Sequence, residues 1–332
     1  MIETISRARL AELLAKGAGQ RVAVVGDAML DVYLRGEVER ISPEAPVPVV
    51  RVVERKLALG GAANVAQNVL AIGAKCELVC AVGSDREGDK LGQMLGELKG
   101  DTRSLVTVKR PTTTKTRVLA RAQQVVRFDE EDDADITGAD VTALIERAIA
   151  AADDASALIL EDYNKGVLTA ALIRPVIEHA NKRKIPVVVD PKYRNFFAYR
   201  GATIFKPNRR ELEAAVGAAV DLEDPKTLPQ ILSRLGVENL LLALGESGMA
   251  LIAADGEVGR VPTTAREVYD VVGAGDTVTA YLGTMLAAGA TPAEAAIIAN
   301  FAAGVEVAKL GAATVSTDEV AEAYDLFGSS AV

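Results

Sequence analysis

Residues 270–277, with the sequence Asp-Val-Val-Gly-Ala-Gly-Asp-Thr, lead into a long apolar segment that starts at Val278. Gly273 and Gly275 are typical of a tight turn, and the apolar segment predicts a buried helix directly after it. The first turn of a helix presents backbone N–H groups without acceptors, together with the positive end of the helix dipole. This stretch therefore predicts an anion site, suited to phosphate, with the carboxylate of Asp276 beside it.

The acidic side chain at this turn has two interpretations. A short acid at the start of a helix can simply cap it. Alternatively, Asp276 is a general base that takes a proton from a hydroxyl group while neighbouring amides hold a phosphoryl group. The pattern alone leaves both open.

The rest of the chain alternates short apolar runs with helical patterns. The runs cover residues 22–25, 78–82, 157–160, 187–189, 240–244 and 249–253. The helical patterns beside them cover residues 62–72, 90–98, 139–152, 170–182 and 209–216. Unbroken apolar strands that alternate with helices indicate a mostly parallel sheet covered on both faces. We therefore predict an α/β fold, a doubly wound, Rossmann-like arrangement of three layers.

Two stretches depart from this alternation, because charged residues are interleaved with apolar ones at residues 47–53 and 105–128. Such strands do not suit a buried parallel sheet, so they predict a small separate β-sheet that serves as a lid or subunit contact. We expect its strands within about residues 33–58 and 104–128 of a single domain that covers residues 1–332. The acidic run at residues 129–135 predicts a solvated turn before a helix.

Composition excludes several classes of protein. The 332 residues include 37 Lys and Arg against 46 Asp and Glu, so the formal net charge is −9. This balance argues against nucleic acid and anionic lipid as partners. The apolar stretch at residues 278–304 is broken by glycine, proline and a glutamate, which predicts packed helices rather than a membrane span. Since the first 17 residues lack a signal-peptide pattern, we expect a cytoplasmic protein.

The sequence offers little scope for catalysis or metal binding by histidine, because His179 is the one histidine. Metal motifs with paired histidines are therefore excluded. A Ser/His/Asp triad would depend on this single residue, which lies in a helical pattern of mixed polarity typical of a surface. Catalysis must then use carboxylates, amides, Lys and Arg side chains or backbone groups.

A second polar pair precedes a helical pattern. Asn208 and Glu211 follow Lys206 and Pro207 directly. Asn at a helix start with Glu three residues later is typical of a capping box. The same pair can instead face Mg²⁺, its waters and nucleotide phosphates. Both interpretations stay open.

Further polar residues follow the first apolar run and precede the helical pattern at residue 62. They are Asp27, Asp31, Gly60, Gly61 and Asn64. Acids beyond the carboxyl end of a parallel strand lie where such sheets bind ligands, and carboxylates accept hydrogen bonds from polyol hydroxyls. The two glycines also fit a plain tight turn. No dinucleotide or P-loop motif follows the first run, which disfavours those enzymes.

Taken together, the glycine pair with Asn64, the pair Asn208 and Glu211, and the turn that ends at Asp276 resemble the ribokinase-like sugar kinases, also called the PfkB family. The resemblance covers nearly the whole chain. Within the family, residues 26–50, 109–128 and 161–167 are similar to the heptose 7-phosphate kinases of lipopolysaccharide core synthesis.

The resemblance implies that the ATP γ-phosphoryl group is transferred to the anomeric hydroxyl of D-glycero-β-D-manno-heptose 7-phosphate, giving the 1,7-bisphosphate and ADP. The alternatives are a related kinase for another sugar phosphate or a nucleoside, and a catalytically silent nucleotide-sensing protein on the same fold.

The resemblance also assigns roles to residues. Asp276 is implied as general base, and the amides of Gly273, Ala274 and Gly275 as the anion hole. The implied nucleotide contacts are Asn208, Glu211, Gly245, Gly248 and Asn300, with Glu211 reaching Mg²⁺ through water. Gly245 and Gly248 fit a hairpin turn equally well.

The implied substrate contacts are Asp27, Asp31, Gly60, Gly61, Asn64, Lys115, Asp162, Lys165 and Lys192. Since the sugar phosphate needs cations, its candidates are Lys115, Arg117, Lys165 and Lys192, each of which also fits a solvated surface charge. Asp270 and Val272 lie where many family members bind a monovalent cation, so potassium is implied besides ATP and Mg²⁺. A homodimer through the lid strands is expected, because a small sheet with apolar faces leaves surface uncovered.

Overall fold

The large β-sheet positions everything else in the molecule. In the computed structural model, which describes residues 4–121, 123–224, 227–254, 256–265 and 268–327, its strand order is β13-β12-β11-β10-β9-β8-β1-β4-β5. The strands are β1 (Arg21–Gly26), β4 (Lys75–Gly83), β5 (Leu105–Val108), β8 (Ala157–Glu161), β9 (Val187–Asp190), β10 (Ile204–Phe205), β11 (Asn239–Ala243), β12 (Met249–Ala253) and β13 (Val258–Val261).

Strand direction creates a place for a ligand. Neighbours from β5 to β11 are parallel, whereas β12 and β13 run antiparallel at one edge. The chain passes from β1 to β4 on one side and later returns to β8 on the other. Ligands of doubly wound sheets bind at such a reversal, beyond the carboxyl ends of the strands.

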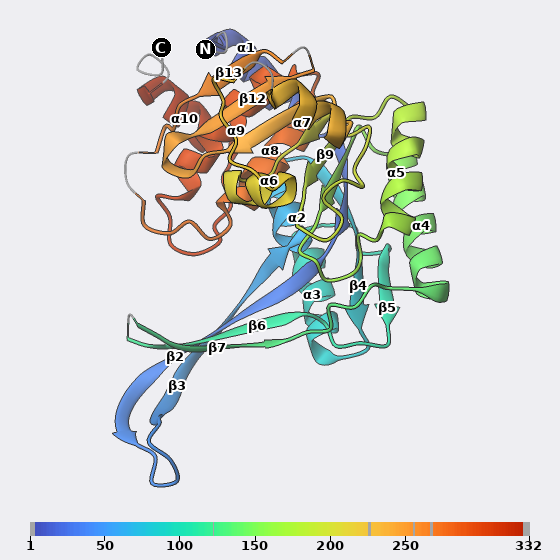
Figure 1. Cartoon of the computed structure of the whole chain (residues 1–332). Coiled ribbons are helices and arrows are strands. Elements are labelled where there is room, and N and C mark those ends of the chain that lie inside the picture. Colours follow the sequence, from blue (N-terminus) through green and yellow to red (C-terminus); the bar gives the residue numbers. More distant parts are fainter. Residues whose placement is uncertain (1–3, 122, 225–226, 255, 266–267, 328–332) are drawn as a thin grey trace.

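Helices cover both faces of this sheet (Figure 1). One face carries α4 (Gly138–Asp153), α5 (Ala170–Lys182), α6 (Arg209–Val216) and α7 (Thr227–Leu235). The other carries α1 (Arg7–Gly17), α2 (Ala62–Ala71), α3 (Arg86–Glu97), α8 (Ala274–Ala287), α9 (Pro292–Glu306) and α10 (Thr317–Phe327). In β1, Val22 and Val24 belong to one core while Ala23 and Val25 belong to the other, as expected for a strand buried on both faces.

The predicted three-layer α/β fold is thereby confirmed. Among the described residues, no helix combines the length and the apolar character needed to cross a membrane.

A smaller sheet, which we call the lid, projects from the core (Figure 1). Its order is β3-β2-β6-β7, built from β2 (Ala28–Ile41), β3 (Pro48–Gly61), β6 (Thr114–Ala120) and β7 (Gln123–Glu130). The observed boundaries differ from those predicted. Residues 105–108 pair with β4 in the large sheet, because they form a short apolar run like its other strands. β2 and β3 reach further into the core than expected, since no break in hydrophobicity marks the point where they leave it.

A close approach of two central strands gives a stability test. A Cβ added at Gly26 would lie 2.0 Å from the backbone oxygen of Glu161, so β1 and β8 would have to move apart. We expect Gly26→Ala to lower the free energy of unfolding by about 1–3 kcal/mol, measured by urea denaturation.

The matched control is Gly96→Ala in α3, where an added Cβ meets nothing within 4 Å. Alanine favours the helix, so this variant should be neutral or gain up to about 1 kcal/mol. Equal unfolding midpoints for the two variants would contradict the packing described here.

Candidate active site

Asp276 lies in the first turn of α8 and is only 5% exposed. The N-cap residue is Gly273, with φ at 97°, and no side chain caps the helix. The Asp276 carboxylate instead accepts hydrogen bonds from Asn64 Nδ2 at 2.6 Å and from the Tyr163 hydroxyl at 2.8 Å. The capping interpretation is therefore wrong, because this side chain bonds to α2 and to the loop after β8.

The surroundings of this carboxylate set its affinity for a proton. Burial raises the pKa of Asp276 to about 6, while the hydrogen bonds from Asn64 and Tyr163 limit the rise. Negative Asp190 raises this pKa further and positive Lys206 lowers it. A carboxylate with a pKa near 6 is mostly ionised at neutral pH and is a stronger base than an exposed aspartate.

The orientation of Asn64 is itself fixed by neighbours on α2. Its Oδ1 accepts from Gln67 Nε2 at 2.7 Å and from Asn68 Nδ2 at 3.3 Å. Since these donors require the oxygen, the amide nitrogen is the end that faces Asp276. Asn64 therefore positions the carboxylate in the structure, a contact that its predicted role with the substrate did not include.

A buried ion pair lies beside the predicted anion site. Lys206 Nζ contacts Asp190 Oδ2 at 2.7 Å, and both residues are buried. A Cβ added at Gly275 would lie 3.8 Å from each of these two atoms. The first turn of α8 thus combines a helix N-terminus with an ammonium group, which suits a phosphate. The Ala274 amide also makes a long contact, 3.4 Å, to the Val271 carbonyl.

A further acid behind this pair was not singled out from the sequence. Glu161 ends β8 and is completely buried, and neither of its carboxylate oxygens has a hydrogen-bond partner among the described residues. Burial, followed by the charges of Asp190 and Asp276, raises the pKa of Glu161 well above its usual value. Glu161, Asp190 and Lys206 all lie at carboxyl ends of strands, the rule that selected Asp27, so their position was an available signal.

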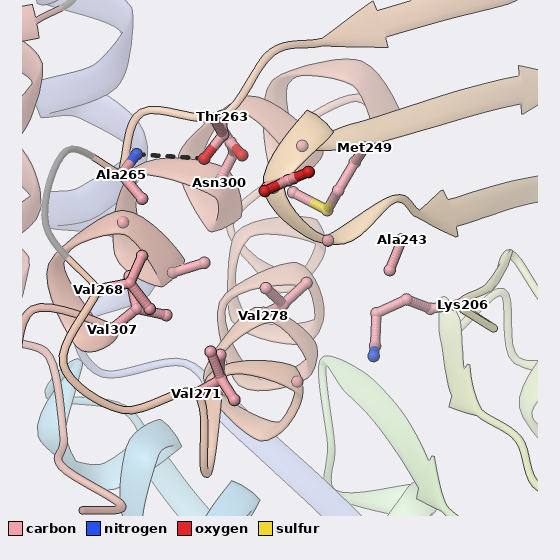
Figure 2. A pocket seen from close by; sticks show the side chains of 17 residues that line it. Lys206, Ala243, Met249, Thr263, Ala265, Val268, Val271, Val278, Asn300 and Val307 are labelled. Carbon is pink, nitrogen blue, oxygen red and sulfur yellow. Dashed lines mark hydrogen bonds between the residues drawn. The ribbon is translucent and has the colours of Figure 1, made fainter. Parts of the chain in front are cut away.

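A cavity of about 500 Å³ adjoins the start of α8 (Figure 2). Its walls are mostly valines and small residues, with Lys206 at one end (Figure 2). The predicted nucleotide contacts Gly245, Gly248 and Asn300 line it. Gly245 and Gly248 also form the turn between β11 and β12, which confirms the hairpin interpretation, and their contact with a nucleotide stays a prediction. Such a cavity fits the apolar faces of a base and ribose.

The pair before α6 forms a complete capping box. Asn208 Oδ1 accepts from the Glu211 amide and Glu211 Oε2 accepts from the Asn208 amide, both at 2.9 Å. Glu211 Oε1 contacts Lys192 Nζ at 2.8 Å. Although burial works against its charge, Asp190 and Glu211 hold the pKa of Lys192 above its usual value. The capping interpretation is confirmed, and the role of Glu211 toward Mg²⁺ stays a prediction.

Two acids predicted to contact the substrate instead organise the loop after β8. Asp27 accepts backbone N–H bonds from Tyr163, Lys165 and Val167 at 2.8 to 3.1 Å. Asp162 accepts from the Tyr199 hydroxyl at 2.7 Å. Both carboxylates are buried, so their main observed partners are protein donors.

Asp31 lies where the lid meets the core. Its carboxylate forms an ion pair with Arg117, whose guanidinium stacks 5.4 Å from the centre of the Tyr33 ring. Gly60 faces it across the strand pair, where an added Cβ would lie 2.9 Å from Asp31 Oδ2. Gly61 is the N-cap of α2. The structure thus brings Asp31, Gly60 and Arg117 together, as expected for one side of a substrate site.

Besides Arg117, which pairs with Asp31, the three predicted lysines fall into two groups. Lys115 and Lys165 both contact Glu131, whereas Lys192 pairs with Glu211 and lies 5.2 Å from the centre of the Tyr163 ring. Lys192 is therefore associated with the predicted nucleotide side.

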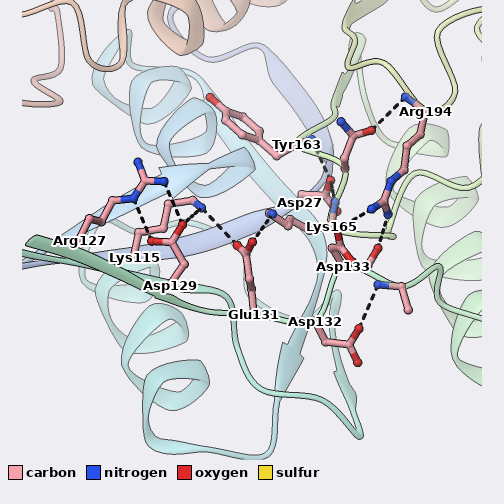
Figure 3. Close-up of polar contacts among 12 residues, drawn as sticks. Asp27, Lys115, Arg127, Asp129, Glu131, Asp132, Asp133, Tyr163, Lys165 and Arg194 are labelled. Carbon is pink, nitrogen blue, oxygen red and sulfur yellow. Dashed lines mark hydrogen bonds and ion pairs between the residues drawn. The ribbon is translucent and has the colours of Figure 1, made fainter.

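The prediction of a solvated turn before a helix is confirmed for residues 131–135, which are exposed and precede α4, whereas residues 129 and 130 still belong to β7. Asp129, Glu131 and Asp133 each pair with basic side chains of the lid or of the core (Figure 3). The sequence pattern did not show which cations the fold brings to them.

This geometry, an anion site at the start of a helix beside a buried carboxylate, suits the transfer of a phosphoryl group to a hydroxyl compound. A family model described as pfkB family carbohydrate kinase matches residues 20–319. The chain belongs to this family, which confirms the resemblance of the sequence motifs.

Relatives of known name agree with this assignment. The protein named "Bifunctional protein HldE" of Rhodospirillum rubrum is 44% identical over 309 residues, 92% of this chain and 62% of that protein. Its namesake in Citrifermentans bemidjiense is 44% identical over 319 residues, 95% and 66% of the two lengths. The chain thus spans 62% and 66% of the length of these two relatives.

Solved structures share the fold. Escherichia coli phosphofructokinase-2 in complex with potassium has a TM-score of 0.74 at 20% identity, covering 94% of this chain and 99% of that one. Arabidopsis thaliana ribokinase complexed with ribose and ATP has a TM-score of 0.70 at 21% identity, covering 92% and 98%.

The hydrogen bond from Tyr163 can be tested without any substrate. Because this bond lowers the pKa of Asp276, Tyr163→Phe should raise that pKa above about 6, as followed by ¹³C NMR of aspartate carboxylates. Tyr193→Phe is the matched control, since Tyr193 is 71% exposed. An unchanged or lower pKa in Tyr163→Phe would refute the described bond.

Proposed function

We propose that the protein is an ATP-dependent kinase that phosphorylates the anomeric hydroxyl of D-glycero-β-D-manno-heptose 7-phosphate, giving the 1,7-bisphosphate and ADP. The observation that carries this proposal is the Asp276 carboxylate, buried at the start of α8 between Asn64 and Tyr163. Membership of the carbohydrate kinase family supports the reaction class. The choice of sugar depends on the similarity of residues 26–50, 109–128 and 161–167 to heptose 7-phosphate kinases.

The arrangement suits phosphoryl transfer, which needs alignment and charge neutralisation more than covalent chemistry. Asp276 accepts the hydroxyl proton as the oxygen attacks phosphorus. The amides of Gly273, Ala274 and Gly275, with Lys206 beside them, stabilise the negative charge on the transferred group. Mg²⁺ bound together with ATP would supply neutralisation of the phosphate charge. Glu211 fits water-mediated contact with it, since its Oε1 is bound only by Lys192 in the described contacts.

The nucleotide and the sugar phosphate occupy different sides of this carboxylate. The base and ribose lie in the cavity lined by Gly245, Gly248 and Asn300. The sugar lies beneath the lid near Asp31 and Gly60, with its phosphate at Lys115 and Lys165. Asp27 holds the loop that carries Tyr163 and Lys165. One segment therefore positions both the tyrosine that bonds to Asp276 and a lysine that contacts the sugar phosphate.

Two further parts of the proposal concern a cation and a partner. Potassium binds near Asp270, whose carboxylate accepts from the Val272 and Gly311 amides and so shapes the loop before α8. The lid pairs with the lid of a second copy, because it exposes many large apolar side chains. They are Val38, Ile41, Val47, Val52, Val53, Val125, Val126 and Phe128.

The test is ADP release from Mg·ATP with the heptose 7-phosphate, compared with fructose 6-phosphate, ribose and adenosine, and with the product located by ³¹P NMR. We expect a new anomeric phosphate from the heptose alone. Turnover of another acceptor instead would refute the choice of sugar, and no turnover of any acceptor would refute the kinase assignment.

The role of the base is tested in the same assay. Asp276→Asn should lower kcat by about two to four orders of magnitude while the Kd for ATP is retained. Asp318→Asn, an exposed acid in the first turn of α10, is the matched control with full activity expected. Near-normal turnover by Asp276→Asn would remove the general base from the proposal.

A further inference from the structure

One carboxylate ties the lid to the core at the predicted sugar-phosphate contact (Figure 3). Glu131, directly after β7, uses both of its oxygens. Its Oε1 contacts Lys165 Nζ of the core loop at 2.7 Å, and its Oε2 contacts Lys115 Nζ of β6 at 3.2 Å. Two ammonium groups from separate parts of the molecule thus share one anion.

The other charges around these lysines do not make this anion redundant. Asp129 contacts Lys115 Nζ at 3.0 Å, but it also pairs with Arg127 at 3.0 Å. For Lys165, Glu131 is the carboxylate in ion-pair contact among the described residues. The three side chains that form the bridge, Lys115, Lys165 and Glu131, are 14–25% exposed, so solutes can reach them.

The position of this bridge relative to the base is fixed. Asp27 Oδ2 accepts the backbone N–H groups of both Tyr163 and Lys165, at 2.8 and 2.9 Å. The Tyr163 hydroxyl then bonds to Asp276. The loop after β8 therefore carries both the tyrosine that bonds to the predicted base and one lysine of the bridge.

We propose that, in the absence of ligand, the Glu131 carboxylate occupies the position of the substrate phosphate. The phosphate then displaces this carboxylate and takes over its contacts with Lys115 and Lys165. This inference rests on the proposed function and adds a determinant of specificity to it. A phosphate monoester carries a charge of about −1.5 to −2 at neutral pH, with three terminal oxygens, so it can replace both carboxylate contacts. A neutral hydroxyl cannot. Glu131 thereby makes binding depend on a phosphorylated ligand.

Inorganic phosphate is the probe for this exchange, titrated calorimetrically into the nucleotide-free protein. Glu131→Gln removes the competing charge and keeps the size of the side chain. It should tighten phosphate binding about three- to tenfold, the range set by the loss of partly exposed ion pairs. Asp133→Asn removes the same charge from the same segment, but Asp133 pairs with Arg194. This control should change the Kd less than twofold.

A variant that lacks both lysines distinguishes displacement of the Glu131 carboxylate from a general effect of Glu131→Gln on folding. In Lys115→Met/Lys165→Met protein, adding Glu131→Gln should leave phosphate affinity unchanged, because the contested cations are gone. Unchanged or weaker phosphate binding by Glu131→Gln itself would overturn the inference, as would an equal gain in Asp133→Asn. These titrations involve no turnover. Lack of heptose 7-phosphate kinase activity would refute the proposed function and leave the phosphate result to be judged separately.

Discussion

The hydrogen-bonded burial of the Asp276 carboxylate is the constraint on which the site depends. Asn64 of α2, Tyr163 of the loop after β8 and Asp276 of α8 are far apart in the sequence and meet at two oxygen atoms. An unpartnered buried carboxylate would be costly, so these bonds fix how α8 starts relative to α2 and the sheet. The same burial raises the pKa of the carboxylate. The packing that stabilises the fold therefore also makes Asp276 a stronger base.

A second buried carboxylate positions the residues on the substrate side of the site. Asp27, at the end of β1, holds the backbone of Tyr163 and Lys165 and so connects the base to the lysines beneath the lid. On the opposite side, the ion pair between Lys206 and Asp190 lies against the first turn of α8, beside the nucleotide cavity. The proposed transfer therefore takes place between two cationic regions whose separation is set by the sheet.

Local patterns in the sequence were enough to predict the fold, and they singled out Asp276, which the structure places, buried, in the first turn of α8. Apolar runs and helical patterns predicted the layers, and the turn before Asp276 predicted the anion site. Partners distant in sequence were not predictable in this way. The burial of Glu161, the pairing of Lys206 with Asp190 and the contacts of the acidic run at residues 129–135 exist only once strands are placed side by side. The capping box at Asn208, a purely local motif, was visible from the start.

The most direct test of the account is the pH dependence of kcat/KM, measured from about pH 5 to about pH 9 with the accepted sugar substrate. A general base acts when deprotonated, so kcat/KM should rise with pH, with unit slope, and level off above the Asp276 pKa of about 6. A profile that is flat across this range, or that falls as the pH rises through 6, would contradict the claim that this buried carboxylate takes the proton.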